Sequence, residues 1–197
     1  MKFRNYVVLC FIWCFLFPVT SVCAQAKFVG ESKCKMCHQK SKDGNAYRIW
    51  KNSNHAKAYK DLGSKEAKQY AEKLGIKTHP QKSLECLICH AAGAELPKNR
   101  FASSFDPKSG VQCENCHGPG EKYKKKKIME RIYREHLAGK YSAAKKYELV
   151  QSNEQTCISQ CHQSKRVVND ITYINPTYKG FDYLKQIKQI AHPTPPK

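Results

Sequence analysis

Apolar positions recur with a helical period over much of the 197-residue chain. Between residues 46 and 62 they are spaced three to five apart, which places them on one face of a helix closed by Gly63. That face is formed by Tyr47, Trp50, His55, Ala58, Tyr59 and Leu62. Similar patterns predict helices over 64–74, 128–137 and 181–191. The chain is therefore predicted to be mostly α-helical.

One segment is apolar throughout. Residues 6–17 form an unbroken run of 12, preceded by Lys2 and Arg4 and followed by Ala-Gln-Ala at 24–26. This order is typical of a secretory signal peptide, and spanning a bilayer needs about 20 apolar residues. We expect cleavage after residue 26, leaving one domain over 27–197 that is soluble on the exported, periplasmic side of a bacterial membrane. An uncleaved anchor is the alternative.

Cysteine is the unusual component of the composition, with 11 residues. Residues 27–197 keep eight of them as four pairs, and a histidine directly follows each pair. The groups are Cys34/Cys37/His38, Cys86/Cys89/His90, Cys113/Cys116/His117 and Cys157/Cys161/His162. C-x-x-C-H is the pattern of c-type haem attachment, in which two thiols on one turn add to the haem vinyl groups and the imidazole ligates the iron. We predict four covalently bound haems, with helices and loops packed around them as a compact multihaem cytochrome.

Paired cysteines have two other common uses. Disulfides suit an exported protein and zinc ribbons use C-x-x-C pairs, but neither requires a histidine after every pair. The fourth group has three residues between Cys157 and Cys161 instead of two. Because Cys161 and His162 remain adjacent, we predict that this group also carries haem.

Four further histidines follow residue 26, and they are the candidates for the second axial ligand of each iron. His55 and His136 lie on the apolar faces of the helices predicted over 46–62 and 128–137, and His192 follows the helix predicted over 181–191. We predict that these three ligate iron. His79 lies in a loop before Pro80 and is predicted to be solvated; closing the second haem or acting as an acid beside it are the alternatives.

The order of these motifs resembles that of the tetrahaem cytochrome c-554 family, which includes c-552/c-554-type multihaem cytochromes. The resemblance rests on GVQCENCHGPG at 110–120, NHAKAY at 54–59 and FDYLKQIKQIAH at 181–192, and it extends from about residue 30 to residue 192.

The resemblance implies a specific ligand set. It implies His55 opposite His117, His136 opposite His38, and His192 opposite His162. The second haem, on Cys86, Cys89 and His90, would then be five-coordinate. The resemblance further implies a hydroxylamine oxidoreductase-like electron donor and an open haem that reacts with nitric oxide.

Charge indicates the class of partner. The chain has 35 Lys and Arg residues against 16 Asp and Glu, a formal charge of +19, and ten basic residues lie within 121–146. The electrostatic field of so positive a protein favours acidic redox proteins as partners and attracts anionic lipid headgroups, whereas export argues against nucleic acid as a partner.

These observations predict a non-enzymatic electron carrier that passes single electrons between redox partners through closely packed haems. The alternative is an enzyme that reduces nitric oxide or another nitrogen oxide at the haem on Cys86 and Cys89. A third hypothesis is that the protein is a structural subunit of a larger haem assembly.

Overall fold

The computed structural model describes residues 25–192 and is mostly helical, which confirms the predicted fold class. The proposed signal peptide lies almost wholly outside the described residues. The helices are α2 (Glu31–His38), α3 (Ala46–Asn52), α4 (Asn54–Asp61), α5 (Lys65–Lys73), α6 (Leu84–His90), α7 (Cys113–His117), α8 (Lys126–Leu137), α9 (Ser142–Lys146), α10 (Glu154–Gln160) and α11 (Tyr183–Gln186). Among them, no helix is long and apolar enough to cross a membrane.

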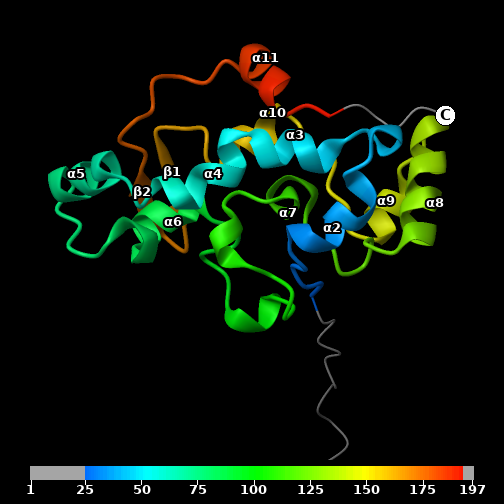
Figure 1. The fold of residues 1–197 in the computed structure, drawn as a ribbon, viewed down its shortest axis with the longest axis horizontal. Helices are drawn as coiled ribbons and strands as arrows, with labels where there is room; N and C mark the ends of the chain where they lie inside the picture. The colour runs from blue at the N-terminus through cyan, green and yellow to red at the C-terminus, as the bar shows by residue number, and fades with distance from the viewer. Residues whose placement is uncertain (1–24, 193–197) are drawn as a thin grey trace, which may run out of the picture.

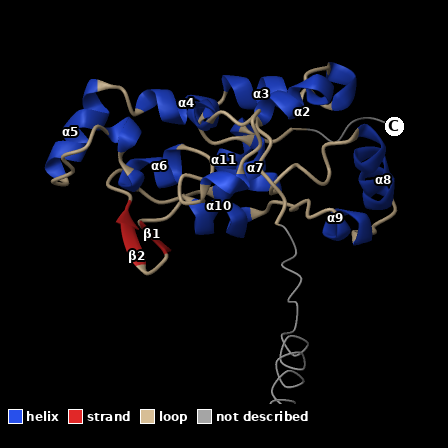
Figure 2. Ribbon diagram, turned by 90° about the horizontal axis from the view of Figure 1, so that it is seen from below, coloured by secondary structure: helices blue, strands red, loops and turns tan. Residues whose placement is uncertain are grey.

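The molecule is elongated, with α5 at one end and α8 at the other (Figure 1, Figure 2). Helices α3 and α4 form a row along one side, and α6, α7 and α2 lie beneath it (Figure 1). Two helices bearing cysteine–histidine motifs, α2 and α7, pack against each other, while α4 packs against a third, α6. The row therefore runs beside three of the four motifs.

The helix predicted over 46–62 is broken at Ser53. Ser53 has extended backbone angles, and both its N–H and its hydroxyl donate to the carbonyl oxygen of Trp50, at 2.9 and 2.7 Å. This local bonding competes with the helical pattern and ends α3. His55 consequently lies in the first turn of a separate helix, α4.

The other helix predictions succeed in part. Helix α5 confirms the prediction over 64–74, and the Ser64 hydroxyl caps it by accepting from the N–H of Ala67 at 3.1 Å. Helix α8 covers 128–137. By contrast, the segment 181–191 forms only one turn of α-helix followed by the 3-10 turn Ile187–Gln189.

A β-hairpin follows the fourth motif and was not predicted. Strands β1 (Lys165–Val168) and β2 (Ile171–Ile174) pair antiparallel, with Arg166 opposite Tyr173. Asn169 and Asp170 form the turn, and both have positive φ, as two-residue hairpin turns require.

The N-terminal segment is held by a buried carboxylate. Phe28 exchanges main-chain hydrogen bonds with Arg100 and Ala102. Glu114, which is only 2 % exposed, accepts from the N–H groups of Val29 at 2.8 Å and Gly30 at 2.7 Å. It also accepts from Gly120 N–H at 2.6 Å. Because Glu114 lies between the cysteines of the third motif, it ties the start of α2 to α7.

Candidate haem sites

The first three motifs have the same local structure. Each occupies a short helix that ends on its histidine: His38 in α2, His90 in α6 and His117 in α7. The helical turn places both cysteines and the histidine on neighbouring positions, as two thioether bonds and one iron ligand require.

The fourth motif departs from this arrangement because of its extra residue. Helix α10 ends at Gln160, Cys161 follows as the residue after the helix, with φ −149°, and His162 lies beyond it. The longer spacer is absorbed by ending the helix early, and Cys161 and His162 remain together. All eight cysteines between residues 25 and 192 are free thiols.

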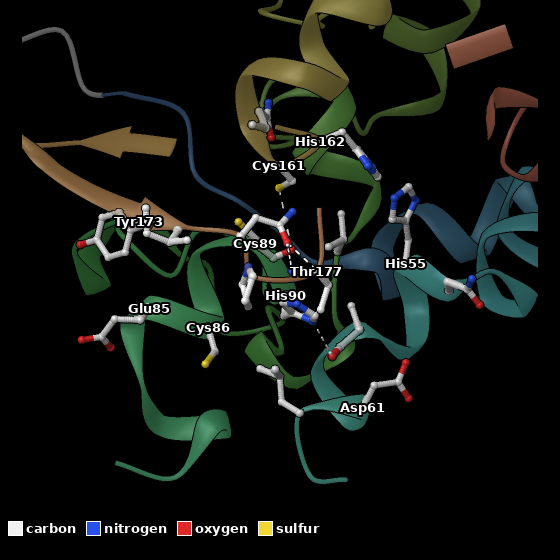
Figure 3. A pocket seen from close by; sticks show the side chains of 18 of the residues that line it. His55, Asp61, Glu85, Cys86, Cys89, His90, Cys161, His162, Tyr173 and Thr177 are labelled. Atoms are coloured by element: carbon white, nitrogen blue, oxygen red, sulfur yellow. Dashed lines mark hydrogen bonds between the residues drawn. The ribbon is translucent and has the colours of Figure 1, made fainter. Parts of the chain in front are cut away.

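Motifs distant in sequence are brought into contact in pairs. Helix α2 of the first motif packs against α7 of the third, and the neighbouring Cys113 thiol, together with burial, raises the pKa of Cys34 well above its ordinary value. In the other pair, the Cys161 thiol donates to the carbonyl oxygen of Cys89 at 3.8 Å (Figure 3). The first motif thus adjoins the third, and the second adjoins the fourth.

Cys37 differs from the enclosed position expected of a haem-binding thiol. Its side chain is exposed, whereas the other seven described cysteines are partly buried. The difference arises because α2 has no fully buried residue and meets the third motif through Cys34, the first cysteine of the pair. The structure therefore turns only one of the two thiols of the first motif inward, and a thioether bond at Cys37 would lie at the surface of the molecule.

Arg166 joins the second pair of motifs. Its guanidinium donates to the carbonyl oxygen of Ile88, inside the second motif, and pairs with Glu95 at 2.7 Å. The hydrogen bond from Cys161 and the charge of Arg166 lower the pKa of Cys89 to about 7. Through Arg166, the strand that follows the fourth motif is therefore hydrogen-bonded to the helix that carries the second motif.

Two pairs of imidazoles come from separate parts of the chain. The ring centroids of His55 and His162 are 6.0 Å apart, and those of His117 and His192 are 5.8 Å apart. Burial lowers the pKa of all four, so each ring is neutral at pH 7 and able to bind metal. Two imidazoles that share one metal ion, each bound at about 2 Å, have centroids about 6 Å apart. Both separations match that arrangement.

Main-chain carbonyls and an aromatic ring orient these imidazoles. Nδ1 of His90 lies 3.2 Å from the carbonyl oxygen of Ala58, and Nδ1 of His117 lies 3.3 Å from that of Val150. Such bonds fix the ring and leave Nε2 for the metal. His162 instead stacks on Phe181, with centroids 4.3 Å apart.

A cavity of about 860 Å³ lies between the second and fourth motifs (Figure 3). Its wall includes the cysteines and histidines of both motifs as well as His55. The other lining is largely apolar and includes Leu62, Ala71, Tyr173, Phe181, Ile187 and Ile190. An apolar cavity with thiols and neutral imidazoles on its wall fits a haem, whose faces are apolar and whose iron takes nitrogen ligands.

The other predicted histidines lie elsewhere. His136 is exposed, and its ring contacts Tyr141 at 5.8 Å rather than another histidine. His79 is exposed, as predicted, and its Nδ1 accepts from the N–H of Gln81 at 3.2 Å. His38 is close enough to His117 and His192 for its charge to lower the pKa of both.

These neighbours differ from those that the resemblance implies. The resemblance pairs His55 with His117 and His192 with His162, whereas the structure places His55 against His162 and His192 against His117. The difference follows from the paths of two segments. Helix α4 packs against α6 of the second motif and brings His55 to His162, and the segment after Phe181 runs on from His162 toward His117.

Comparison with known proteins supports a family assignment. Residues 33–118 match the family model described as cytochrome c554 and c-prime. The match contains the first three motifs and His55, and it stops before the fourth motif. No curated protein and no solved structure matches the chain. Proteins of this kind bind haem c covalently and transfer electrons through it. Residues 33–118 of the chain therefore have the sequence of the cytochrome c554 and c-prime family.

Proposed function

We propose that the protein is an exported electron carrier with four covalently bound haems. The observation that carries this proposal is the pairwise contact of the motifs, first with third and second with fourth. Because every haem is fixed by its cysteines, contact between two motifs brings their haems close together. Haem supplies a one-electron couple, and closely spaced haems allow an electron to cross the molecule.

The chain's own residues hold and orient the haems. The eight cysteines would form the thioether bonds, and His38, His90, His117 and His162 would each ligate one iron. Carbonyl oxygens of Ala58 and Val150 hold two of these rings in place. The largely apolar wall of the cavity would cover part of the second and fourth haems, and such a surrounding shell tunes the reduction potential.

We infer that His55 is the second ligand of the fourth haem and His192 that of the third. The ring separations of 6.0 and 5.8 Å support these assignments over the pairs that the resemblance implies. Within residues 25–192, no other histidine ring is in contact with that of His38 or that of His90. Following the resemblance, we keep His136 as the candidate second ligand of the first haem, opposite His38, and five ligands for the second haem.

Mass spectrometry of the exported protein tests the haem count and the signal peptide together. The expected mass corresponds to a chain that begins at Lys27 and carries four haems. The Cys157→Ala/Cys161→Ala double variant should retain three. A wild-type protein with three haems would refute attachment at the fourth motif, and an N-terminus at Met1 would refute cleavage.

Peptide mapping of the same protein tests the exposed thiol of the first motif. The haem on this motif should be bonded to both Cys34 and Cys37. A haem bonded to Cys34 alone, with Cys37 still open to a thiol-alkylating reagent, would show that the exposed cysteine is not an attachment site.

The ligand pairing is tested by electron paramagnetic resonance of the oxidised protein. His55→Ala should convert one haem from low spin to high spin. In the Cys157→Ala/Cys161→Ala background, which lacks the fourth haem, the same substitution should change nothing. A new high-spin signal in that background would show that His55 serves a different haem.

Reduction of a small molecule is a second candidate function. It is favoured by the position of His90, whose side chain lines the cavity (Figure 3) and whose ring contacts no other histidine ring within residues 25–192. An open iron in this cavity would bind nitric oxide or carbon monoxide. Carbon monoxide uptake by one haem in four of the reduced protein supports this function; no uptake, with only low-spin signals, leaves electron transfer alone.

A further inference from the structure

Helices α8 and α9 form a hairpin with an apolar core of its own. Ile132, Ala143 and Ala144 are buried together there with Tyr123, which also reaches the third motif. Glu135 joins the two helices by accepting from the Ser142 hydroxyl at 2.6 Å and the Ala143 N–H at 2.7 Å. Residues 121–148, here called the basic hairpin, are therefore not explained by the need to enclose haem.

The basic hairpin carries most of its positive charge on the outside. Three of its carboxylates are occupied by ion pairs: Glu130 with Lys126, Glu135 with Arg131, and Glu148 with Lys122. Within residues 25–192, several exposed basic side chains of the hairpin take part in none of the ion pairs. They are Lys124, Lys125, Lys127, Arg134, Lys140, Lys145 and Lys146.

Apolar side chains are exposed where the two helices meet. Leu137 is 46 % exposed and Tyr141 is 50 % exposed, on either side of the turn at Gly139. An apolar centre ringed by charge is the usual composition of a protein–protein interface. A membrane surface is a poorer fit, because the apolar face of α8 is already buried against α9 through Ile132.

The base of the hairpin contacts the third motif directly. Val150, just after the hairpin, donates its N–H to the carbonyl oxygen of His117 at 2.9 Å. The Tyr123 hydroxyl donates to the carbonyl oxygen of Gly118 at 2.5 Å. The hairpin also lies at the end of the molecule that holds α2 and the first motif (Figure 1, Figure 2).

We propose that the basic hairpin is the docking surface for a redox protein with an acidic face, which exchanges electrons with the first and third haems. This inference rests on the proposed electron-transfer function. Its acidic partner is identified by charge complementarity alone: the uncompensated lysines and arginines form one continuous segment beside two motifs. Such a surface accelerates association by attracting the partner before contact.

Charge reversal on the hairpin, matched by the same reversal at the far end of the molecule, tests the proposal. The hairpin variant is Lys125→Glu/Lys127→Glu/Lys140→Glu. All three side chains are exposed, and the first two lie at the start of α8, where acidic residues favour the helix, so the fold should be retained. Lys124 is left unchanged because its charge acts on the buried Glu114. The control variant reverses Lys65, Lys68 and Lys73 on α5, which gives the same net charge.

The measurement is the second-order rate of reduction by flavodoxin, an acidic one-electron donor, followed by stopped flow at increasing salt. The hairpin variant should react about 10- to 100-fold more slowly at low salt, and the control less than about 3-fold more slowly. All three rates should converge near 1 M salt. An equal slowing of reduction by flavodoxin in both variants, or no slowing in either, would show that the basic hairpin is not the docking surface.

Two controls separate this result from other causes. Reduction by dithionite should be equally fast in all three proteins; failure of the wild type to accept electrons from either donor would refute the proposed function itself. Sedimentation with phosphatidylserine vesicles tests whether a membrane, instead of a protein, is the partner of the basic hairpin. If the hairpin variant lost vesicle binding and kept its rate with flavodoxin, the partner would be a membrane and the proposal would be wrong.

Discussion

Replacing Glu114 tests whether the third motif anchors the start of the chain. Its two carboxylate oxygens accept from three main-chain N–H groups in a site only 2 % exposed. In Glu114→Gln one oxygen becomes an NH2 group. If the amide oxygen stays with Gly120 and Val29, then Gly30 N–H loses its acceptor and faces another donor.

The magnitude follows from those bonds. An unsatisfied buried N–H costs about 1–3 kcal/mol, and the other two bonds lose the contribution of a charged acceptor. We expect Glu114→Gln to lower the free energy of unfolding by about 2–4 kcal/mol. Glu121 supplies the control, because it also accepts from the N-terminal segment, at 2.8 Å from Lys27 N, but is exposed. Glu121→Gln should cost no more than about 0.5 kcal/mol.

The assay is guanidinium unfolding of the holoprotein, followed by far-ultraviolet circular dichroism. Unfolding slopes for the two variants should match that of the wild type, so that the midpoint shift reports stability. Equal midpoints for Glu114→Gln and Glu121→Gln would show that burial of this carboxylate does not matter. The anchoring role would then be refuted.

Three further outcomes are expected. Arg166→Gln should destabilise the holoprotein by about 2 kcal/mol by leaving Glu95 unpaired in a largely buried position, and adding Glu95→Gln should restore part of that loss in a double-mutant cycle by chemical unfolding. Trp50→Phe should cost about 1–2 kcal/mol in the same assay, because the carbonyl oxygen of Val111 loses the indole N–H that donates to it at 2.7 Å. The hydrogen bonds to Glu135 lower its pKa to about 2, so its stabilising contribution is complete above its unfolded pKa near 4.5 and is lost as pH falls toward 2. The difference in melting temperature between wild type and Glu135→Gln should therefore shrink over that range. A difference that grew on acidification would show that ionised Glu135 does not stabilise the fold.

Features set by local sequence were predictable. The cysteine–histidine groups lie in short helices because their spacing matches one helical turn, and α5 begins and ends at its Ser64 and Gly75 signals. The sequence pattern does not predict the break at Ser53, because the helical spacing of apolar residues continues through it. The run Asn52-Ser53-Asn54 contained the signal, since these side chains compete for main-chain hydrogen bonds. Asn169-Asp170 between β-branched residues similarly marked the hairpin turn.

Features that depend on long-range contacts were not predictable. Which imidazole faces His162 or His117 depends on the paths of α4 and of the C-terminal segment, and no local pattern encodes them. The role of Arg166 was equally hidden, because one arginine among 35 basic residues carries no signal until its strand is placed against Ile88 and Glu95. Glu114 lies within the third motif, and no local pattern in the sequence predicts that its side chain is buried.

The attachment of the N-terminal segment has a consequence for the order of assembly. Val29 and Gly30 find their acceptor in Glu114, and Phe28 finds its main-chain partners in Arg100 and Ala102. A chain that emerges from its N-terminus displays the first haem motif early but cannot fix that motif in place until about 90 further residues have followed. The first motif can therefore stay extended and accessible until Glu114 has followed it, whereas the last motif is completed only after Glu114 is available to hold the N-terminal segment.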